Sequence, residues 1–154
     1  MKKSVLTTII VLLSCATSAL AQYDKDVFMW RGRQALSDGK YAQAIENFNV
    51  LTRLDTTSYW GFFFRGIAKY NLGDLRGADT DFSTSVRLNP VFTNGYHYLG
   101  ITKSRFGEYD EAYKDFRKAL ELRPGQYGIY FSRGVTSFLA QKFQDAVQDF
   151  DTYI

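Results

Sequence analysis

The chain has 154 residues, of which 45% are hydrophobic and 23% charged, a balance typical of a folded globular protein and not of a disordered one. It carries 19 Lys and Arg against 16 Asp and Glu, and without Lys2 and Lys3 the net charge is 17 − 16 = +1, which excludes a basic surface for nucleic acid. One histidine and one cysteine are too few for a zinc site or a Cys/His catalytic pair.

Residues 1–21 have the pattern of a secretory signal peptide. Lys2 and Lys3 precede an apolar run over residues 5–13, and Ala19 and Ala21 then fit a cleavage site. We therefore expect an exported bacterial protein, located in the periplasm, that begins at Gln22. An alternative is a lipobox that ends at Cys15, in which case Cys15 would anchor the protein to the envelope as a lipoprotein, its one route to a membrane.

From Lys25 onward, the sequence repeats with a period of 34 residues. Three columns carry the repeat: a glycine column, an alanine column and an aromatic column, namely Gly32, Gly66, Gly100, Gly134; Ala44, Ala78, Ala112, Ala146; and Phe48, Phe82, Phe116, Phe150. The period predicts units at 25–58, 59–92, 93–126 and 127–154, the last of them incomplete.

Each unit reads as two short amphipathic helices. A hinge glycine separates them at Gly39, Gly73 and Gly107, and Gln141 takes that place in the last unit. Pro90 and Pro124 follow the second helices of two units and stop them. The small residues of the columns are expected where two helices cross closely, with the aromatic side chains beside them. The fold class is therefore all-α.

These columns resemble the tetratricopeptide repeat family. The resemblance covers the chain from Lys25 to Ile154 and implies a right-handed α-solenoid of antiparallel helix pairs, with the first helix of each pair lining a concave groove. Arginine replaces the family's usual leucine at Arg65 and Arg133, and we expect these arginines to pair with Asp81 and Asp149. As partly exposed ion pairs they would contribute roughly 0–1 kcal/mol to stability.

A second stripe runs along the first helices, on the side that the resemblance assigns to the groove. Aromatic and aliphatic members would contact a protein or peptide partner, and polar members would add selectivity. The apolar candidates are Trp60, Phe63, Ile67, Tyr70, Phe131, Val135 and Phe138, and the polar ones are Asn94, His97 and Arg105. The competing interpretation is that the apolar side chains are core between neighbouring first helices.

We expect no enzymatic activity, cofactor, metal or small-molecule substrate, since neither a catalytic group of residues nor a phosphate-binding glycine motif is evident. The clamp that some family members use for the acidic C-termini of chaperones is also not expected. Its asparagine column reads Arg33, Ile67, Ile101 and Val135 in this chain.

The predicted function is therefore an exported, non-enzymatic scaffold for a protein or peptide. An alternative is the N-terminal repeat region of a longer envelope enzyme, sensor or lipoprotein assembly factor, because the last unit stops within a repeat. The apolar face of the last helix, including Val147 and Ile154, would also allow self-association.

Overall fold

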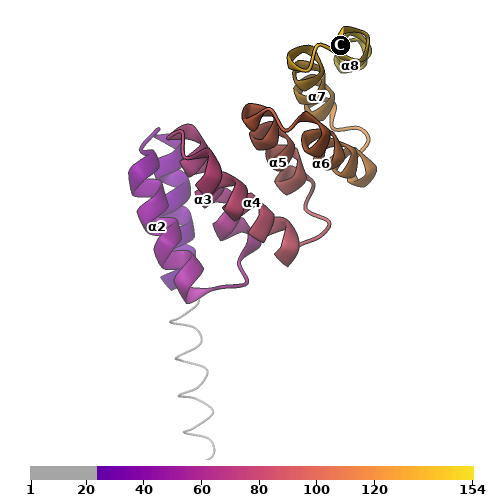
Figure 1. Cartoon of the computed structure of the whole chain (residues 1–154). Coiled ribbons are helices and arrows are strands. Elements are labelled where there is room, and N and C mark those ends of the chain that lie inside the picture. Colours follow the sequence, from indigo (N-terminus) through magenta and orange to yellow (C-terminus); the bar gives the residue numbers. More distant parts are fainter. Residues whose placement is uncertain (1–23) are drawn as a thin grey trace, which may run out of the picture.

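The computed structural model describes residues 24–154, so the predicted signal peptide and Cys15 lie outside the described residues. A helical segment at 24–37 is followed by helices only, joined by short turns (Figure 1). They are α2 (Tyr41–Leu54), α3 (Tyr59–Asn71), α4 (Leu75–Leu88), α5 (Thr93–Phe106), α6 (Tyr109–Leu122), α7 (Tyr127–Leu139) and α8 (Phe143–Tyr153).

Consecutive helices pack as pairs, and the pairs follow one another in an elongated array from α2 to α8 (Figure 1). The most extensive packing is within a pair: α3 with α4, α5 with α6, and α7 with α8. Between pairs, α2 packs on α3, α4 on α5, and α7 on both α5 and α6. The expected α-solenoid of antiparallel helix pairs is confirmed.

Each pair closes around one glycine and one phenylalanine from the repeated columns. A Cβ atom built on Gly100 would lie 2.7 Å from the ring of Phe116, and one on Gly66 would lie 2.7 Å from the ring of Phe82. Phe48, Phe82 and Phe116 are fully buried. The glycine column therefore exists because the aromatic ring of the second helix occupies the space where a side chain would stand.

The three hinge glycines have left-handed backbones, with φ of 71° at Gly39, 84° at Gly73 and 79° at Gly107. Gln141 adopts the same conformation with φ of 60°, the only non-glycine residue to do so among residues 24–154. The turn is thus kept in the fourth pair although its residue is not suited to it.

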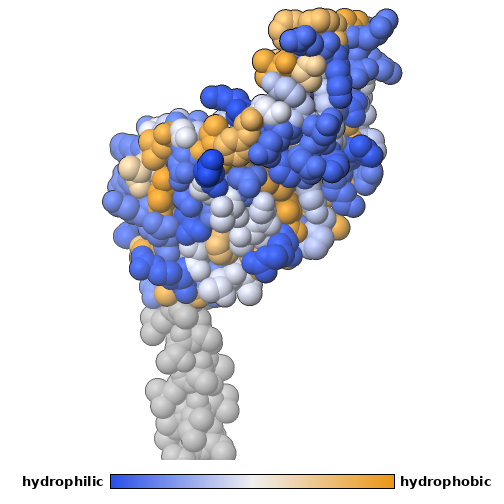
Figure 2. Space-filling view, viewed as in Figure 1, coloured by the Kyte–Doolittle hydropathy of each residue, from blue (hydrophilic) through white to orange (hydrophobic). Residues whose placement is uncertain are grey.

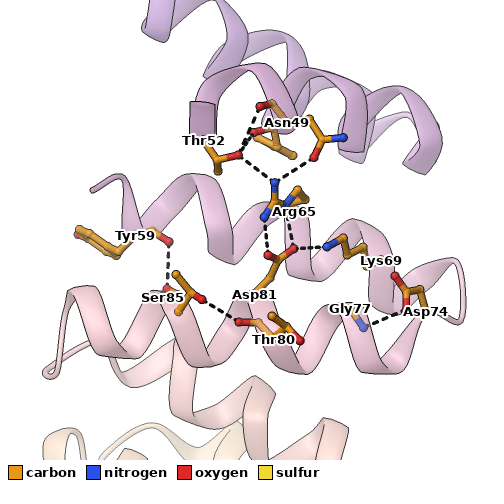
Figure 3. Close-up of polar contacts among 12 residues, drawn as sticks. Asn49, Thr52, Tyr59, Arg65, Lys69, Asp74, Gly77, Thr80, Asp81 and Ser85 are labelled. Atoms are coloured by element: carbon orange, nitrogen blue, oxygen red, sulfur yellow. Dashed lines mark hydrogen bonds and ion pairs between the residues drawn. The ribbon is translucent and has the colours of Figure 1, made fainter. Parts of the chain in front are cut away.

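The predicted pairs Arg65–Asp81 and Arg133–Asp149 both form, but they are more deeply buried than a surface pair. Arg65 donates from Nε and Nη2 to the two carboxylate oxygens of Asp81, at 2.9 and 2.6 Å, and Lys69 lies 2.8 Å from the same carboxylate (Figure 3). The side chain of Asp81 is 3% exposed. The expectation of a partly exposed pair is therefore wrong for Asp81. Removal of one partner would leave buried charge without compensation.

The third pair builds the same contact from a different residue. Leu99 stands in the arginine column, and Lys103 instead donates to Asp115 at 2.6 Å. Lys103 occupies the repeat position of Lys69, which contacts Asp81 in the second unit. The third unit therefore keeps this lysine but has a leucine in place of the arginine. An ion pair between the two helices is thus present in the second, third and fourth units.

Candidate functional site

A hollow of about 240 Å3 lies between the first helices of three consecutive pairs. Its lining combines apolar side chains with a few polar ones, and comes from α3, α5 and α7: Tyr70; Ile101, Ser104 and Arg105; Phe131, Ser132, Val135, Thr136 and Leu139. We call this the inner hollow. Its members recur at helical spacing on each helix, which is why one face of each first helix supplies them.

Two hydrogen bonds join α5 to α7 at the inner hollow. Thr136 donates from Oγ1 to Ser104 Oγ at 3.0 Å, and both residues are buried. One turn away, His97 Nε2 lies 2.8 Å from Ser132 Oγ. These contacts hold the two helices at a set distance and so position the apolar side chains that surround them.

His97, which contacts Ser132 in the lining of the inner hollow, has a shifted pKa. It is half-buried, with its ring near those of Tyr98 and Phe116. Burial lowers the pKa of His97 to about 4, because a charged imidazolium would lose its hydration there. At neutral pH, His97 is therefore an uncharged hydrogen-bonding group.

Arg105 supplies the charge at the rim. Its side chain is exposed, and its guanidinium carbon lies 6.0 Å from the centre of the Tyr70 ring. The lining of the inner hollow contains no carboxylate. The site therefore offers an apolar pocket with one positive charge at its edge.

Four of the ten residues predicted from the sequence meet at the inner hollow: Tyr70, Arg105, Phe131 and Val135. His97 joins them through its contact with Ser132. Phe131 and Val135 are exposed, so a partner could reach them. Figure 2 shows hydrophobic surface at the top of the molecule, where α7 and α8 lie in Figure 1.

Phe63 must be withdrawn as a groove residue, because its side chain is only 3% exposed. Its ring is packed between those of Phe92 and Tyr98, at 4.8 and 5.4 Å. Ile67 is half-buried against the same core. For these two residues the competing interpretation, core between neighbouring helices, describes the structure.

The other three predicted residues lie outside the inner hollow. Asn94 accepts a hydrogen bond from Gln126 Nε2 at 3.1 Å, beside the turn that precedes α7. Trp60 stacks on Phe64, whose ring also carries Arg33 at 5.4 Å. Phe138 is exposed and touches Phe143 across the α7–α8 turn.

The sequence reasoning missed Ser132, Thr136 and Leu139 as members of the lining. Each follows a predicted residue directly on α7, after Phe131, Val135 and Phe138 respectively. A stripe two residues wide would have found them, since the apolar face of a helix commonly spans about 100° or more.

Residues 24–154 contain no group of three or more side chains arranged to hold a metal ion. Over the same residues, no helix has the length and apolar character needed to cross a membrane.

Comparison with known proteins identifies the repeat. A family model described as tetratricopeptide repeat matches residues 93–126, the same limits that the sequence period assigns to the third unit. No curated protein sequence matches the chain significantly.

Solved structures share the whole architecture. A crystal structure of MamA superposes with a TM-score of 0.77 at 25% identity, covering 84% of this chain and 75% of that one. The Arabidopsis OM64 TPR domain gives 0.71 at 20% identity, covering 79% of this chain and 98% of that one. The second TPR domain of human RPAP3, solved in complex with the HSP70 peptide SGPTIEEVD, gives 0.73 at 20% identity, covering 76% and 98%. Residues 93–126 are therefore a tetratricopeptide repeat, and the structures described with that name share the fold of this chain.

Proposed function

We propose that this chain is a non-enzymatic scaffold that holds an extended segment of a protein partner along its inner face, with the inner hollow as the anchor point. The observation that carries the proposal is the convergence of exposed apolar side chains from α7 with Tyr70 and Arg105 around one hollow. Clusters of this kind, with aromatic residues and arginine, supply much of the binding energy at protein interfaces.

The expected partner segment carries an apolar side chain for the hollow. The RPAP3 domain shows that this fold can hold a peptide. Ile101 and Val135 occupy the column in which the family resemblance places the asparagines of the chaperone clamp, and both line the inner hollow. The hollow is therefore suited to an apolar anchor and not to a terminal carboxylate.

The localisation proposed with this function is export to the periplasm, with a lipid anchor at Cys15 as the alternative. It rests on the sequence pattern of residues 1–21 alone.

Selection from a displayed peptide library on the purified chain tests the proposal. We expect enriched peptides to share an apolar position and to lose at least tenfold in affinity for Val135→Asp, since the carboxylate would lie in the hollow without a partner. Val147→Asp on α8 is the matched control, because Val147 is also exposed but does not line the hollow. Equal affinity for the two variants, both folded by circular dichroism, would refute the inner hollow as the binding site.

A further inference from the structure

A second and larger hollow, of about 470 Å3, lies between α6, α7 and α8. Its lining differs in character from that of the inner hollow, because it contains four basic side chains: Lys114, Arg117, Arg133 and Lys142. We call it the outer hollow. Neither the proposed function nor the family resemblance uses it.

The second unit shows how an arginine in this column is normally satisfied. Arg65 donates hydrogen bonds from Nε and Nη2 to the carboxylate of Asp81. Its remaining nitrogen, Nη1, donates to two acceptors of the preceding unit, Asn49 Oδ1 and Thr52 Oγ1, both at 2.9 Å (Figure 3). Each of the three guanidinium nitrogens therefore donates to a protein acceptor.

Two periods later the same arginine lacks those acceptors. Arg133 also donates from Nε and Nη2 to a carboxylate, that of Asp149, at 2.8 and 2.5 Å. The positions 68 residues after Asn49 and Thr52, however, are Arg117 and Leu120. A hydrogen-bond acceptor is thus replaced by a second guanidinium, and a hydroxyl by an aliphatic side chain.

In the third unit no arginine lacks an acceptor in this way, because Leu99 stands in the arginine column and has no donor in its side chain. Arg117 is exposed and forms no ion pair with any of residues 24–154. Two guanidinium groups therefore line the outer hollow with donors that no acceptor among residues 24–154 satisfies.

We propose that the outer hollow binds a small oxyanion, a phosphate or carboxylate group, between Arg117 and Arg133 in the place that Asn49 Oδ1 takes beside Arg65. Guanidinium donors form charge-assisted hydrogen bonds to such groups, often two at a time. The anion supplies Arg133 with the acceptor that Asn49 supplies to Arg65.

The carboxylates around the hollow define where the anion sits. Asp149 is occupied by Arg133, and Asp110 lies 3.7 Å from Lys142. Asp145, at the start of α8, also lines the hollow and repels an anion. The site is therefore on the α6–α7 side, between the two arginines and away from the first turn of α8.

Thermal unfolding of the full chain in sodium phosphate, against sodium chloride of equal ionic strength, tests the proposal. At phosphate about tenfold above its Kd, the melting temperature should rise by about 3–6 °C. A parallel titration with citrate separates the two sources of the oxyanion: a response to citrate alone assigns the site to carboxylates, and a response to phosphate alone assigns it to phosphate groups.

The decisive variant is Arg117→Asn, which restores the residue that the first unit uses. We expect it to abolish the phosphate response and to raise the melting temperature in chloride, because Arg133 regains an internal acceptor. Arg87→Asn, an exposed arginine on α4, should keep the full response. An anion-dependent shift that persists in Arg117→Asn, or wild-type shifts in both phosphate and citrate no larger than in chloride, would overturn the proposal.

Discussion

At the scale of single residues, the strongest energetic statement concerns Asp81. Its carboxylate receives Arg65 and Lys69 while almost fully buried. Asp81→Ala would leave two cations without their counter-charge, and we expect a loss of about 3–5 kcal/mol in the free energy of unfolding, measured by urea denaturation.

Glu111→Ala is the control for Asp81→Ala. Glu111 pairs with Lys114 on an exposed face of α6, where solvent screens the two charges and the pair adds little to stability. If both variants lose the same small amount, the Asp81 network contributes no more than a surface pair, and our interpretation of its burial is wrong.

His97 should make stability depend on pH. Its pKa is about 4 in the folded chain and about 6.5 when unfolded, so between these values the unfolded chain binds a proton that the folded chain does not. Stability contributed by neutral His97 is thus complete above pH 6.5 and is lost as the pH falls towards 4. Between pH 7 and 5 the loss should be on the order of 1–2 kcal/mol.

The measurement is urea denaturation at both pH values for wild type and His97→Gln, since the glutamine amide can reach Ser132 as Nε2 does but does not titrate. The carboxylates affect both proteins alike, and the difference between the two pH slopes isolates His97. Identical slopes would mean that protonated His97 is accommodated in the folded chain.

At the scale of elements, the turn between paired helices is set by one left-handed residue. No atom other than its chain neighbours lies within 4 Å of a Cβ built on Gly107, so Gly107→Ala would encounter backbone strain without a clash. We expect it to cost about 1–2 kcal/mol. Gln141→Gly should instead stabilise by about 0.5–1 kcal/mol, the relief of strain less the added entropy of the unfolded chain. Opposite signs in thermal denaturation are the expected result, and a loss for both variants would contradict it.

The elements themselves could be predicted because their signals are local. The 34-residue columns placed the helices and the Gly–Phe contact of each pair, since both depend on residues of one unit. The burial of Phe63 could not be predicted, because Tyr98 of the next unit and Phe92, the last residue of its own unit, cover it. The depth of Asp81 was missed for a related reason: Arg65 is also bonded by Asn49 and Thr52 from the unit before.

At the scale of the whole molecule, the junctions between units differ more than the units do. The arginine of the second unit finds acceptors across its junction, while the arginine of the fourth lines a hollow that Arg117 also lines. The inner hollow likewise requires α3, α5 and α7 together. The repeat period can be read from the sequence, but the angle between consecutive units cannot. Both hollows lie between units, so their positions could not be predicted from the sequence.

Each unit contacts mainly its neighbours. The same glycine-to-alanine substitution should therefore destabilise more helices in one unit than in another. A Cβ on Gly100 or Gly134 would lie 2.7 or 2.8 Å from the ring of its partner, Phe116 or Phe150. Phe116 is fully buried, while Phe150 is half-buried and can move more easily. Gly100→Ala should therefore destabilise by about 1–3 kcal/mol, and Gly134→Ala by less.

Hydrogen exchange of the two variants separates local from global effects. Gly134→Ala should speed exchange in α7 and α8 only, because these two helices pack on each other far more than on α5 and α6. Gly100→Ala should speed exchange in α3–α8, because the third unit connects the second to the fourth through α4–α5, α5–α7 and α6–α7 packing. Exchange confined to α5 and α6 in Gly100→Ala would mean that the units unfold independently and that the array has little cooperativity.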